Sequence, residues 1–127
     1  AAFDGLAFDR GVQVALSTDG ELGVLSTLFS ARTLGLTGEL APTAQADYLS
    51  GLMIGHELAA LATVQRRRRH SVHLPSIILI GNAQLCARHG RALDACGFAN
   101  VTLAEQATER GLWQLALAAG LIDSSSR

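Results

Sequence analysis

Residues 76–80 (Ser-Ile-Ile-Leu-Ile) form a short, uninterrupted run of β-branched and aliphatic side chains. Such a run is typical of a strand buried on both faces, as strands are inside a parallel sheet. Residues 101–103 predict a second, very short strand. Two parallel strands cannot bury both of their faces alone. We therefore expect the chain to be part of something larger or to associate with another chain, and a homo-oligomer is one such arrangement.

The rest of the chain shows helical periodicity. Apolar side chains at helical intervals predict helices at residues 3–16, 22–29, 43–65, 83–95 and 104–119. Residues 32–40 are expected to be an irregular connection, because Gly35 and Gly38 weaken a helix and Pro42 follows them. In the last helix, Leu112, Trp113, Leu115 and Ala116 are expected to face inward. The pattern predicts a helix-rich α/β fold with few strands over residues 1–122, followed by a frayed tail at residues 123–127.

The composition excludes several classes of protein. The chain has 127 residues, of which 49% are hydrophobic and 17% charged, and its formal net charge is −1. We therefore expect one soluble domain without the positive field that attracts nucleic acid or an acidic membrane. No apolar run is long enough to span a membrane and the first residues lack a signal pattern, so a cytoplasmic location is expected. The basic run at residues 66–70 is interpreted as the solvated end of a helix, where cations complement the dipole.

The long helix predicted at residues 43–65 contains an apolar stripe and two glycines. The stripe consists of Ala46, Leu49, Met53, Ile54, Leu58 and Leu61, which are expected to be buried. Gly51 and Gly55 stand four residues apart on one face and allow another backbone to approach closely. We favour close packing over a ligand contact for this pair, although Gly55 is kept as a candidate nucleotide contact.

The strongest candidate site is Gly81-Asn82, at the carboxyl end of the strand predicted at residues 76–80. Parallel sheets bind ligands beyond the carboxyl ends of their strands, and helix N-termini favour anionic or polar groups. Glycine lets a ligand approach the backbone, and Asn82 can both donate and accept hydrogen bonds. Asn82 could equally be an ordinary N-cap, and the motif alone does not decide between the two interpretations.

Other chemical motifs are weaker. Arg32 follows an apolar helix, where it could bind a phosphate or carboxylate or pair with a neighbouring acid. His56-Glu57 does not form a zinc-protease motif, because Ala60 stands where a second histidine is required. The sequence contains no glycine-lysine phosphate loop, nucleophile elbow or spaced set of metal ligands. No catalytic residue and no metal ligand is assigned.

Several segments together resemble one family. They are Leu28-Phe29-Ser30-Ala31-Arg32, residues 46–57 with the core Leu49-Ser50-Gly51-Leu52, Ile77-Ile78-Leu79-Ile80-Gly81-Asn82 followed by Leu85, Ala87-Arg88 and Ala92-Leu93, Phe3 to Gly11, and Gly111-Leu112-Trp113. The chain is similar to the C-terminal part of 2-dehydro-3-deoxygalactonokinases. The resemblance implies phosphorylation of 2-dehydro-3-deoxy-D-galactonate at its 6-hydroxyl with ATP and Mg²⁺, and one lobe of a ribonuclease-H-like kinase of the actin and hexokinase type.

The resemblance also implies what this chain lacks. The turn at Gly81-Asn82 would correspond to the family's adenosine-binding element, and the long helix would lie close to the nucleotide. The family's phosphate loops, catalytic acid and N-terminal lobe belong to a region that this sequence does not contain. Because phosphoryl transfer depends on positioning and charge stabilisation, the isolated chain is expected to be inactive or nearly so. A non-catalytic nucleotide-binding regulator of the same fold is the alternative.

Overall fold

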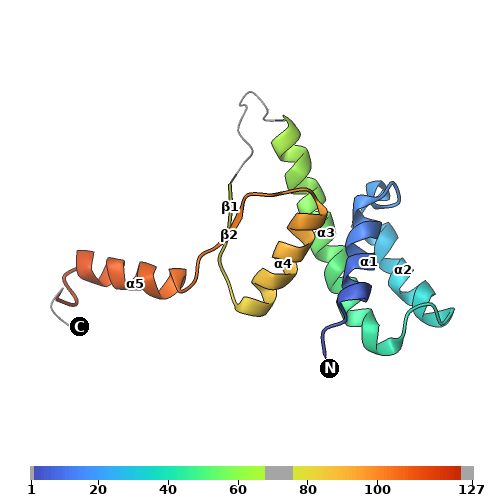
Figure 1. The fold of residues 1–127 in the computed structure, drawn as a ribbon, viewed down its shortest axis with the longest axis horizontal. Helices are drawn as coiled ribbons and strands as arrows, with labels where there is room; N and C mark the ends of the chain where they lie inside the picture. The colour runs from blue at the N-terminus through green and yellow to red at the C-terminus, as the bar shows by residue number, and fades with distance from the viewer. Residues whose placement is uncertain (1, 68–75, 124–127) are drawn as a thin grey trace.

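A computed structural model describes residues 2–67 and 76–123. These residues form helices α1 (Gly5–Leu16), α2 (Val24–Leu36), α3 (Gln45–Arg67), α4 (Ala83–Ala95) and α5 (Ala107–Ala118), strands β1 (Ile77–Leu79) and β2 (Val101–Leu103), and the 3₁₀ turns η1 (Gly20–Leu22) and η2 (Pro42–Ala44). Figure 1 shows α1, α3 and α4 packed together, with α2 at the edge of the bundle away from α4. The helix-rich α/β expectation is confirmed at this level, whereas the ribonuclease-H-like lobe stays a prediction.

Helices α1 and α3 pack closely because glycines remove the side chains between them. A Cβ added to Gly51 would collide with the carbonyl oxygen of Phe8, and one added to Gly11 would collide with the backbone of Tyr48. At Gly55 an added Cβ would lie 2.7 Å from the Cβ of Ala15. The close-packing interpretation of Gly51 and Gly55 is therefore the one that the structure describes.

Helix α2 corrects one prediction. It continues through Arg32 and Gly35 to Leu36, where an irregular connection was expected; a single interior glycine costs a helix only about 1 kcal/mol. The helix ends just before Gly38, which has a φ of 76°. Two hydrogen bonds join α2 to α3. They connect Thr27 Oγ1 with His56 Nε2 and Ser30 Oγ with the Tyr48 hydroxyl, both at 2.7 Å.

The two strands form a parallel pair in which Ile77 lies opposite Val101. Helix α4 connects them and covers one face, where Ile77, Leu79 and Val101 pack against the core. The other face is open, and Ile78 is 61% exposed. The expectation that the first strand is buried on both faces is therefore wrong for this chain by itself, because the described residues contain no second layer.

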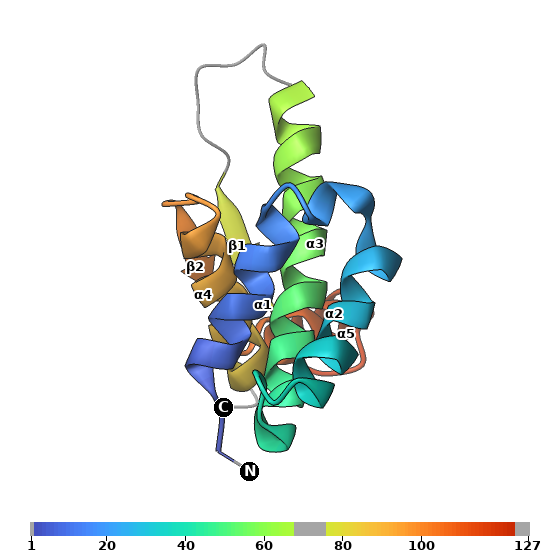
Figure 2. The same ribbon diagram turned by 90° about the vertical axis from the view of Figure 1, so that its right-hand side faces the viewer.

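The apolar core consists of two clusters on either side of the α1–α3 contact. One is formed by Phe8, Val12, Ile54, Leu58, Ala92 and Leu93 from α1, α3 and α4; the other is formed by Ala7, Ala31, Leu40, Ala44 and Tyr48. Figure 2 shows α1 and α3 side by side between α2 and the β1–α4–β2 unit. The predicted stripe of the long helix is partly wrong, because Met53 is half exposed while Tyr48 and Leu52 are fully buried.

Helix α5 extends away from the rest of the chain in Figure 1. None of its residues is buried, and Leu112 and Leu115 are exposed. The expectation that this helix faces inward is therefore wrong here: its apolar residues have no surface to cover among residues 2–67 and 76–123. No helix in these two ranges is long and apolar enough to cross a membrane. Residues 68–70 of the basic run and 124–127 of the tail lie outside the described ranges.

Candidate functional site

The carboxyl ends of β1 and β2 meet at one edge of the sheet, because the strands are parallel. The N–H of Ala104 donates to the carbonyl of Leu79 at 2.9 Å, which holds the segment after β2 beside the end of β1. An open hollow of about 450 Å³ lies in this segment and is lined by Leu103, Ala104, Glu105, Ala107 and Arg110. The structure thus contains the type of sheet edge at which α/β proteins bind ligands.

The turn from β1 into α4 contains Gly81 and Asn82, both exposed. Asn82 is the N-cap of α4, and its side-chain oxygen accepts a hydrogen bond from the N–H of Leu85 at 2.8 Å. An added Cβ at Gly81 would meet only Cys86 Sγ at 3.5 Å, an ordinary contact. Internal packing therefore does not require a glycine here. The N-cap interpretation of Asn82 is confirmed, whereas nucleotide contact by Gly81 and Asn82 stays a prediction.

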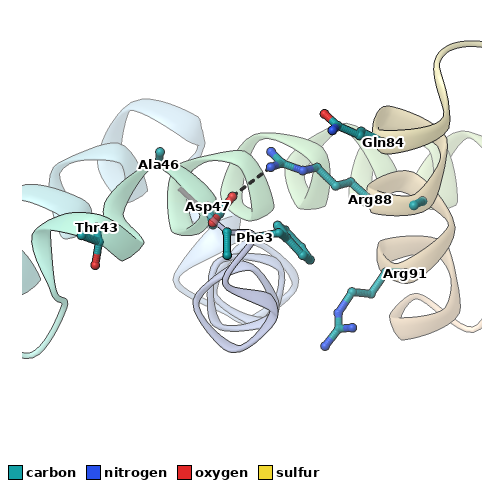
Figure 3. Close-up of a pocket in the computed structure, with 9 residues that line it drawn as sticks. Phe3, Thr43, Ala46, Asp47, Gln84, Arg88 and Arg91 are labelled. Carbon is teal, nitrogen blue, oxygen red and sulfur yellow. Dashed lines mark hydrogen bonds and ion pairs between the residues drawn. The ribbon is translucent and has the colours of Figure 1, made fainter.

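A second hollow, here called the cleft, lies beside this turn, between the N-terminal ends of α1 and α3 and the face of α4 that carries Arg88 and Arg91. It has a volume of about 540 Å³, and its lining includes Phe3, Thr43, Asp47, Gln84, Arg88 and Arg91. Figure 3 shows Arg88 reaching from α4 to Asp47 on α3. Gln84 stands in the first turn of α4, so this cleft and the turn at Gly81 share the same end of one helix.

Asp47 and Arg88 form a half-buried ion pair in the wall of the cleft. Arg88 Nη2 lies 3.0 Å from Asp47 Oδ1, and Arg88 Nη1 donates to Ser50 Oγ at 3.0 Å. The other carboxylate oxygen of Asp47 accepts the backbone N–H of Asp4 at 2.8 Å. The guanidinium of Arg88 also lies over the ring of Phe3, 4.8 Å from its centre. One carboxylate thus joins α3, α4 and the segment before α1.

Arg91, one turn further along α4, pairs with Asp9 of α1. Arg91 Nε and Nη2 donate to the two carboxylate oxygens of Asp9 at 2.5 and 2.6 Å. These hydrogen bonds hold the pKa of Asp9 below its usual value, against a smaller opposing effect of desolvation. The two arginines of the cleft are therefore both matched by carboxylates, so the cleft has no strong excess of either charge.

The other two candidate residues lie elsewhere. Gly55 is buried against Val12 and Ala15, so α1 occupies the space that a nucleotide would need on that face of α3. Its assignment as a nucleotide contact finds no support in this packing. Arg32 is exposed on α2, on the other side of α1 and α3 from α4 (Figure 2), and forms no ion pair with any residue in the described ranges. Its role as a phosphate or substrate contact stays a prediction.

Sequence reasoning missed Asp47, Ser50 and Arg88. All three lie in segments that carry the family resemblance, but the resemblance implies no role for their side chains. The available signal was a charged residue, Asp47, within an otherwise apolar helical segment, since a buried carboxylate requires partners. Within the described ranges, no group of three or more His, Cys, Asp or Glu side chains is placed to hold a metal ion.

Comparison with known proteins gives the following matches. A family model described as 2-keto-3-deoxy-galactonokinase matches residues 1–115. The 2-dehydro-3-deoxygalactonokinase of Escherichia coli (strain K12) is 32% identical over 91 residues, which are 72% of this chain and 28% of that relative. The chain therefore spans little more than a quarter of the length of this curated relative. No solved structure matches the chain significantly.

Proposed function

This chain belongs to the 2-keto-3-deoxy-galactonokinase family, and on that premise we propose that it is the C-terminal, nucleotide-side part of an ATP-dependent sugar-acid kinase. The proposed reaction transfers the terminal phosphoryl group of ATP to the 6-hydroxyl of 2-dehydro-3-deoxy-D-galactonate. The family membership supports a kinase acting in galactonate metabolism. The substrate, the position of transfer and the place of this chain within the whole protein belong to the proposal.

The observation behind the nucleotide-side assignment is the open turn at Gly81-Asn82. An added side chain at Gly81 would meet almost nothing, so the backbone is accessible there. Because the Asn82 side chain accepts the N–H of Leu85, the backbone N–H groups of residues 82, 83 and 84 remain without an intrahelical acceptor at this helix N-terminus. Such groups suit the hydroxyls, ring nitrogens or phosphates of a nucleotide.

In the proposed enzyme, this chain binds and orients the adenosine side of ATP, and other parts of the protein perform the transfer. Phosphoryl transfer requires cations and an in-line alignment of the attacking and leaving oxygens. The described residues offer no grouped ligands for Mg²⁺, so no step through the metal is assigned to them. The metal ligands, the phosphate loops and the base that accepts the hydroxyl proton are proposed to lie in the missing N-terminal lobe.

The test compares the protein extended to the length of its relatives with this chain alone. We expect sugar-acid-dependent ADP release from the extended protein with MgATP and 2-dehydro-3-deoxygalactonate, and little or none from the chain. We also expect MgATP to slow hydrogen exchange at residues 81–85. Gly90 lies in the same helix, and a Cβ added to it would meet only Leu79 Cδ1 at 3.9 Å. Gly90→Ala therefore serves as the control that shows whether a change elsewhere in α4 alters hydrogen exchange at residues 81–85.

Each result has a separate meaning. If the extended protein is active but saturating MgATP does not change hydrogen exchange at residues 81–85, the kinase proposal is supported and nucleotide binding at this turn is contradicted. An extended protein that binds MgATP but releases no ADP with any sugar acid would favour a nucleotide-binding regulator of the same fold. Full activity from the isolated chain would contradict the division of labour proposed above.

A further inference from the structure

The two halves of α4 are held in different ways. The C-terminal half contributes Ala92 and Leu93 to the core, where both are essentially inaccessible to solvent. The N-terminal half contributes only one buried side chain, Cys86, while Leu85 remains half exposed. The half that begins at the Gly81-Asn82 turn therefore has little apolar burial to fix its position.

Polar contacts of Arg88 hold the N-terminal half of α4 in place. Its guanidinium donates to Asp47 and Ser50, both on α3 and both at 3.0 Å, and it lies over the ring of Phe3. A planar guanidinium with several donors fixes orientation as well as distance, which a single contact does not. Arg88 therefore holds α4 against two other elements, one turn after the residues proposed to contact the nucleotide.

The environment of this pair makes it more effective than an ordinary surface pair. The side chain of Asp47 is 10% exposed and that of Arg88 31%, so solvent ions screen the pair only partly. Asp47 also lies in the first turn of α3, where the helix dipole favours a carboxylate. The second polar link between the two helices is longer, with His89 Nε2 3.7 Å from Glu57 Oε2, and the Glu57 side chain is 71% exposed.

We propose that Arg88 is a positioning residue for the nucleotide: with Asp47 and Ser50 it fixes the N-terminal half of α4, and thereby the turn at Gly81-Asn82, in the orientation that binds ATP. This inference rests on the proposed function. Binding sites need their contact groups held within a fraction of an ångström by residues that do not themselves touch the ligand. Arg88 acts through the helix and does not need to contact the nucleotide.

The test uses the extended protein and separates nucleotide binding from catalysis. Arg88→Met keeps the length of the side chain but removes its donors, and it is expected to raise the KM for MgATP and the Kd for MgATP measured by calorimetry by about tenfold, with kcat changed by less than about twofold. The KM for the sugar acid should stay unchanged. Arg88→Lys, which keeps the charge without the fork, should recover part of the loss.

Two further variants control for misfolding of Arg88→Met and for the general effect of removing an arginine that joins two elements. Ser50→Ala removes one partner of Arg88 without leaving a buried charge, so it tests the same link even if Arg88→Met does not fold, and it should weaken MgATP binding in the same direction by a smaller factor. Arg10→Met removes another arginine that joins two elements, through Glu39 on the exposed far side of α1. It should leave both KM values at the wild-type level.

The outcomes are distinguishable. A folded Arg88→Met or Ser50→Ala protein that binds MgATP as tightly as wild type and as Arg10→Met overturns the inference while the proposed function stands. A variant that lowers kcat and leaves the KM for MgATP unchanged also overturns it, because the loss would then lie in the transition state alone. Failure of the wild-type extended protein to bind MgATP would overturn the proposed function first, and this inference with it.

Discussion

Replacing Gly51 with alanine is expected to force α1 and α3 apart. The added Cβ would fall on the carbonyl oxygen and carbonyl carbon of Phe8. These are backbone atoms of a helix, so they cannot rotate away as the end of a side chain could. The two helices must therefore separate or shift along each other, and both core clusters include residues from each of them.

The magnitude follows from two opposing effects. In a helix interior, replacing glycine with alanine stabilises by about 1 kcal/mol where space is available. Overpacking a well-packed contact costs roughly 1–3 kcal/mol, and a collision with backbone belongs at the upper end of that range. The net loss in the free energy of unfolding should be about 2 kcal/mol, which lowers the Tm of a chain of this size by about 8 °C.

The assay is urea denaturation of this chain, followed by far-ultraviolet circular dichroism, for wild type, Gly51→Ala and Gly90→Ala. The Gly90→Ala variant is the matched control, because its added Cβ meets only Leu79 Cδ1 at 3.9 Å and should stabilise by up to about 1 kcal/mol. The two alanine variants should thus move in opposite directions. A Gly51→Ala protein as stable as wild type would refute the close packing of α1 against α3.

Three further predictions concern single contacts. Asn82→Ala removes the N-cap of α4 and should lower the free energy of unfolding by about 1 kcal/mol, whereas Asn82→Ser should retain most of it; thermal denaturation compares them. Tyr48→Phe removes the buried hydrogen bond to Ser30 and should cost about 1 kcal/mol in the same assay; no loss would contradict a formed bond. Arg91 lowers the pKa of Asp9, so their contact stabilises the fold above the unfolded pKa of Asp9, and this stabilisation is lost as the pH falls through the folded pKa. Arg91→Met should therefore be less stable than wild type at pH 7 and approach it below about pH 4. A difference in stability that does not change with pH would exclude this linkage.

The elements that could be predicted from the sequence are those with local signals at both ends. The helix at residues 83–95 has Asn82 as its N-cap and Gly97, with a φ of 81°, just beyond its end, and its predicted bounds are those of the structure. The strand predicted at residues 101–103 from its short apolar run is confirmed as well. The end of α2 was missed because Gly35 and Gly38, followed by Pro42, indicated an irregular connection, whereas Gly35 lies within the helix and only Gly38 follows its end.

Burial and the candidate site were harder, because both depend on residues far apart in the chain. Periodicity shows that Phe29 or Trp113 lies on an apolar stripe, but not whether any surface covers that stripe, and both side chains are substantially exposed here. The pairing of Asp47 with Arg88 spans 41 positions, and neither residue has a sequence motif that identifies its partner. The N-cap role of Asn82 could be predicted because it belongs to a local turn.

The two core clusters lie in different stretches of the chain, and this affects how the protein is made. Ala7, Ala31, Leu40, Ala44 and Tyr48 all precede residue 67, so the bundle of α1, α2 and α3 can assemble on the ribosome as soon as that stretch has emerged. The other cluster must wait for Ala92 and Leu93, which follow after a few seconds at roughly 5–20 residues per second. During that interval Phe8 and Ile54 lack the cover of α4, so we expect the nascent bundle to expose apolar surface until α4 has been made.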